Sequence, residues 1–205
     1  MDDKIGVIQD IEQREIMMFK LKYRISENQS DMQNNDSNLL EEQSTIYGFI
    51  LLQFDQKEIG YIVDEDEAPS PENIECEMYL YNENLTWWFE TLLKVSNLLE
   101  KNSYVRFRLL EAADKWISFE KGTSNLVVIF FEYLDSGSDI VSLDRVMAKT
   151  VIYTEIIDFR DFQKEIIINT NKFIQEVIDI NQNLLNTDRL SNLCQELAYS
   201  IKFKY

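Results

Sequence analysis

The spacing of apolar residues changes along this chain, and this change constrains the fold more than any other feature of the sequence. From residue 16 to residue 157, apolar side chains mostly recur at every second position, which is the spacing of a β-strand with one buried face. The interruption at 86–101 and the end of the chain have the three- and four-residue spacing of helices. Strands followed by helices predict an α+β fold, with an antiparallel or mixed β-sheet, one central helix and a C-terminal two-helix hairpin packed on the sheet.

Eight segments have the spacing of strands. The first has a basic outer face, because Lys20, Lys22 and Arg24 alternate with apolar residues. Arg106 and Arg108 give the fifth segment the same kind of face. The second segment is apolar nearly throughout, as expected of a central strand. The predicted strands are 16–25, 46–54, 58–63, 74–80, 104–110, 116–119, 126–133 and 151–157.

Three segments have helical spacing. The central helix is predicted over 86–101, with Asn84 or Thr86 as its N-cap, and the second over 161–185. Thr187-Asp188 then offers a cap for a shorter third helix. The residues predicted to face the core are Trp88, Leu92, Val95 and Leu99 of the first helix, Phe162, Ile166, Phe173, Val177, Ile180 and Leu184 of the second, and Leu190, Leu193, Leu197 and Ile201 of the third.

The length and composition fit one domain. A chain of 205 residues that is 45% hydrophobic can bury a sizeable core, so we predict a single domain over 1–205. Residues 26–44 are rich in Asn, Gln, Ser and Asp and are expected to form a mobile polar loop. Residues 160–205 are expected to form the helical hairpin. The protein is expected to be either a monomer or a dimer that forms through this hairpin.

The chain is strongly acidic. Its net charge of −17 repels nucleic acid and anionic lipid and favours a basic protein partner, although the same charge would also serve solubility alone. Only two cysteines occur, far apart in the sequence, which indicates a reducing compartment. The first residues lack the apolar run of a signal peptide, and no stretch approaches 18 apolar residues. We therefore predict a cytoplasmic protein that binds neither nucleic acid nor membrane.

Signatures of catalysis and metal binding are scarce. The chain has no histidine, which excludes the common histidine-based catalytic and metal sites, and it has no glycine-rich phosphate loop. Asp55-Gln56-Lys57 fits a metal-dependent nuclease pattern only by its residue types, and a hairpin turn explains it better. The acidic run 64–67 lacks the residue order of a calcium-binding loop. We predict no cofactor, no metal and no enzymatic activity, and leave open an enzyme that uses carboxylates, with or without Mg²⁺.

The distribution of charge is the most informative positive feature. From residue 58 to residue 93 there are ten acidic residues and no basic one. Such a surface steers a basic partner and supports tight inhibition. Three bulky aromatic residues, Trp87, Trp88 and Phe89, start the central helix; either all three are buried, or Trp87 is exposed as an interface anchor. The predicted partner-binding residues are Asp64, Glu65, Asp66, Glu67, Glu75, Glu77, Glu83 and Trp87.

Part of the chain resembles a known class of proteins. The segments 115–119 (KWISF), 126–131 (LVVIFF) and 153–157 (YTEII), followed by the terminal helices, are similar to small acidic immunity proteins of Gram-positive bacteria. Those proteins are encoded beside secreted polymorphic toxins and neutralise them by direct binding. The resemblance implies a cytoplasmic, non-enzymatic inhibitor whose acidic face meets a basic toxin domain, often a nuclease. It carries no motif from which functional residues follow.

The sequence leaves other functions open. A nucleic-acid mimic would use the same acidic surface against many basic proteins. A structural adaptor would dimerise through an apolar stripe of the C-terminal hairpin. The function we predict is a stoichiometric immunity or inhibitor protein.

Overall fold

The computed structural model describes residues 18–26, 44–62, 83–110, 112, 114–134 and 140–202. Within them, the first sheet has four strands, and every strand pairing is antiparallel. Its central strand β2 (Tyr47–Phe54) lies between β1 (Phe19–Ile25) on one side and β3 (Lys57–Tyr61) with the short β4 (Glu83–Asn84) on the other. Strand β2 has neighbours on both sides, and nearly all of its residues are buried.

In the part of the chain that the structure describes, the second sheet has five strands in the order β8-β5-β6-β7-β9, again with antiparallel pairings. The strands are β5 (Tyr104–Arg108), β6 (Lys115–Lys121), β7 (Asn125–Glu132), β8 (Val141–Ser142) and β9 (Thr150–Asp158). The register of β7 against β9 shifts between Phe130 and Phe131, which places a bulge near the start of β9.

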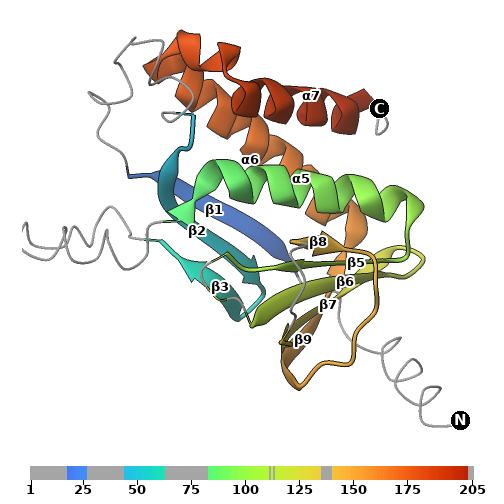
Figure 1. Cartoon of the computed structure of the whole chain (residues 1–205). Coiled ribbons are helices and arrows are strands. Elements are labelled where there is room, and N and C mark those ends of the chain that lie inside the picture. Colours follow the sequence, from blue (N-terminus) through green and yellow to red (C-terminus); the bar gives the residue numbers. More distant parts are fainter. Residues whose placement is uncertain are drawn as a thin grey trace, which may run out of the picture.

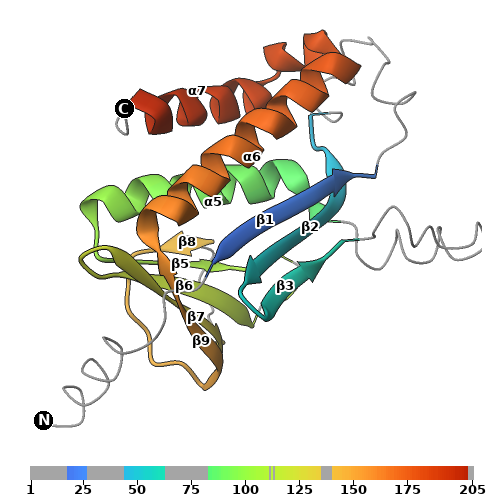
Figure 2. The ribbon, with the colours of Figure 1, turned by 180° about the vertical axis from the view of Figure 1, so that it is seen from behind.

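The helices gather on one side of the two sheets, as both ribbon views show (Figures 1 and 2). Helix α5 (Leu85–Lys101) contacts β2 and β5, so it spans both sheets, and α6 (Phe159–Ile180) follows β9 directly and crosses β1. After the 3-10 helix η2 (Gln182–Asn186), helix α7 (Asp188–Lys202) packs on α5 and α6. The predicted α+β fold with C-terminal helices is therefore confirmed, and its strands divide into two sheets.

Local sequence rules account for most of these elements. Strand β1 alternates between buried or half-buried apolar residues and exposed Lys20, Lys22 and Arg24, as its spacing predicts. The β2–β3 hairpin turns at Asp55, whose φ of 56° is a left-handed conformation that Asp adopts more readily than most residues. This turn accounts for the residue types at 55–57, as the interpretation of these residues as a hairpin turn predicts. The predicted strand 74–80 and most of the predicted loop 26–44 lie outside the described residues.

The C-terminal helices differ from the prediction at two places. The second helix was expected to run to residue 185, but α6 ends at Ile180, and the Asn181 side chain accepts a hydrogen bond from the Asn183 amide (3.0 Å) that starts η2. Ile201 was expected to face the core and is 40% exposed. Ser200 turns inward in its place and donates to the Asn97 side chain of α5 (2.8 Å). Dimerisation through these helices stays a prediction.

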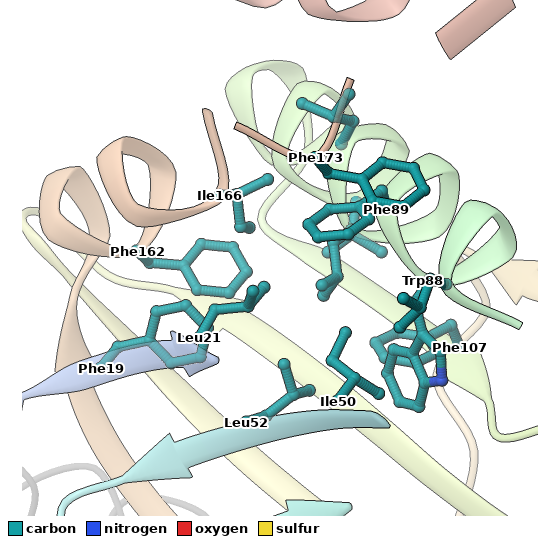
Figure 3. Close-up of a cluster of buried hydrophobic side chains, with 14 of the residues drawn as sticks. Phe19, Leu21, Ile50, Leu52, Trp88, Phe89, Phe107, Phe162, Ile166 and Phe173 are labelled. Atoms are coloured by element: carbon teal, nitrogen blue, oxygen red, sulfur yellow. The ribbon is translucent and has the colours of Figure 1, made fainter. Parts of the chain in front are cut away.

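One hydrophobic core joins both sheets and the helices (Figure 3). The fully buried Phe162 of α6 lies 5.0 Å from the ring of Phe19 in the first sheet and 5.0 Å from that of Phe119 in the second. Farther along the helices, Phe89 of α5 stacks on Phe173 of α6 at 4.6 Å. Through these aromatic contacts, the two sheets share a single hydrophobic core.

Candidate partner-binding surface

The structure describes two of the eight predicted partner-binding residues. Glu83 lies in the short strand β4, directly before α5, and Trp87 lies in the first turn of α5. The other six lie outside the described residues: Asp64, Glu65, Asp66, Glu67, Glu75 and Glu77. The start of α5 is therefore the part of the predicted surface whose geometry is known.

The start of α5 is held by two polar side chains. Asn84 is the N-cap, and its Oδ1 accepts a hydrogen bond from the Trp87 amide at 2.9 Å. The buried Thr86 accepts from the Ile46 amide (3.0 Å) and donates to the Ser44 carbonyl (2.9 Å), which ties the helix to the residues that lead into β2. Both predicted capping residues thus fix this end of the helix, by different contacts.

The three aromatic residues at this end are largely buried. Trp88 is 3% exposed and Phe89 is fully buried. Trp87 is half-buried, with its ring 5.2 Å from that of Trp88 and 6.3 Å from that of Phe107. Glu83 accepts a hydrogen bond from the indole nitrogen of Trp88 at 3.1 Å. Trp87 is therefore only partly accessible, and one carboxylate oxygen of Glu83 is already engaged.

The charge of the chain is distributed unevenly. The described residues contain 17 lysines and arginines and 17 aspartates and glutamates, so this part of the chain carries no net charge. The remaining residues contain only 3 basic residues against 20 acidic ones, which is the whole surplus of −17. Seventeen of those acids fall in 1–17, 27–43 and 63–82. Most of the surplus acidic residues therefore fall in three segments of the sequence.

The face of the second sheet that points away from the helices carries arginines and aromatic rings. Arg106 is only 4% exposed, and its guanidinium carbon lies 4.2 Å from the ring centre of Trp116 and 5.2 Å from that of Tyr133. Nearby, Arg145 bonds the carboxylate of Glu120 at 3.0 Å. The alternation in 104–110 correctly placed Arg106 on this face, but its burial depends on rings from other strands, which spacing does not reveal.

Few titratable groups in the described part have a shifted pKa that would suggest a catalytic role. Burial raises the pKa of the Cys194 thiol, which opposes a nucleophilic role. Burial also raises the pKa of Glu90 on α5, an effect that the charge of Arg189 partly offsets. Among the described residues, no three or more Asp, Glu, Cys or His side chains group so that they could hold a metal ion. None of the described helices is both long and apolar enough to cross a bilayer.

Searches against protein-family models, curated proteins and solved structures find no match to this chain. The class of protein is therefore given by the fold of the described residues, an α+β protein with two antiparallel sheets and its helices gathered on one side of them.

Proposed function

We propose that this chain is a non-enzymatic, stoichiometric binding protein, namely a bacterial cytoplasmic immunity or inhibitor protein that neutralises a basic toxin domain by direct contact. The observation that carries the proposal is the run from residue 58 to residue 93, which holds ten acidic residues and no basic one in a chain with a net charge of −17. A surplus spread evenly over the surface would serve solubility alone. A concentrated one creates a strong local field that steers a basic partner.

The proposed contact residues follow from the sequence. Six carboxylates in 63–82 supply the charge that meets the partner: Asp64, Glu65, Asp66, Glu67, Glu75 and Glu77. Glu83 and the accessible part of Trp87 come next in the chain, at the rigid start of α5. A half-buried tryptophan beside an acidic segment combines an apolar contact with charge, which is the composition expected of an inhibitor surface.

The test compares two variants of equal charge. In the first, Asp64, Asp66, Glu75 and Glu77 are changed to Lys; in the control, four acids of the neutral part are reversed. The control residues are Asp114, Asp144, Asp161 and Asp179, whose side chains are at least partly accessible. Wild type and both variants are used to capture proteins from a lysate of the source cells. The captured protein is then purified, and its dissociation constant for each chain is measured at about 0.05 M and about 0.3 M salt, which spans a large change in screening.

The proposal predicts one basic partner in a one-to-one amount, bound by wild type and control and lost with the first variant. Equal binding by both variants would remove the acidic segment from the interface. Capture of many basic proteins that added DNA releases would indicate a nucleic-acid mimic instead. Failure to capture any basic protein would contradict the proposal.

A further inference from the structure

We draw no further inference here: the strongest candidate, the exposed apolar surface of Met147, Val151 and Ile152 at the β7/β9 end of the second sheet, is flanked by charged groups of both signs such as Lys115 and Glu132, and nothing in the structure shows what covers it.

Discussion

Substitution of Phe162 tests whether the two sheets share one core. Its ring is fully buried and touches Phe19 of the first sheet and Phe119 of the second, each at 5.0 Å. Removal of a buried phenylalanine side chain costs about 3–5 kcal/mol, and each aromatic pair contributes about 0.5–1.5 kcal/mol beyond its area. Because Phe162→Ala loses two such pairs, we expect about 4–5 kcal/mol, which is most of the stability of many domains.

The assay is urea unfolding followed by tryptophan fluorescence, in which a loss of this size lowers the midpoint by about 2 M. Phe162→Leu keeps most of the apolar volume and should cost less than about 1.5 kcal/mol. Ile168→Ala on the same helix changes a residue that is 50% exposed and should stay within about 0.5 kcal/mol. Trp88 of α5 and Trp116 of β6 should report one transition. A cost below about 1.5 kcal/mol for Phe162→Ala, or a separate transition at Trp116, would refute the shared core.

Three further substitutions test local contacts, each by urea unfolding. Asn84→Ala removes the N-cap of α5 and should cost about 1 kcal/mol; no loss would mean that another group caps the helix. Thr86→Val leaves the Ile46 amide without its acceptor inside the core, so we expect the free energy of unfolding to fall by about 1–3 kcal/mol. An unchanged urea midpoint would contradict this expectation. Burial raises the pKa of Glu90 in the folded state, and the charge of Arg189 opposes this rise. The folded chain therefore binds a proton at higher pH than the unfolded chain does, so the contribution of Glu90 to stability falls as pH rises. Glu90→Gln should therefore gain stability relative to wild type between about pH 4 and about pH 7, and a difference that does not change with pH would contradict the assignment.

Much of the fold follows from short-range spacing. The alternation in β1, the apolar run of β2 and the stripe of α5 each reflect the direction in which neighbouring side chains point, and this depends on the local backbone alone. The two end-of-helix errors have the same origin, because Asn181 and Ser200 make specific hydrogen bonds that interrupt an otherwise regular pattern. Glu83 and Trp87 could be located at the start of α5 by the same reasoning, but the hydrogen bond from Trp88 to Glu83 could not.

The sequence by itself determined the class of fold, the positions of most of the elements now described, the absence of histidine chemistry and the total charge. Only the tertiary structure decided that the strands divide into two sheets joined through Phe162, because spacing shows which face of a strand is buried and not which strand it pairs with. The tertiary structure also buried Arg106 against the rings of Trp116 and Tyr133. These residues are distant in sequence, and their proximity depends on the closure of long loops around a common core, which no local pattern encodes.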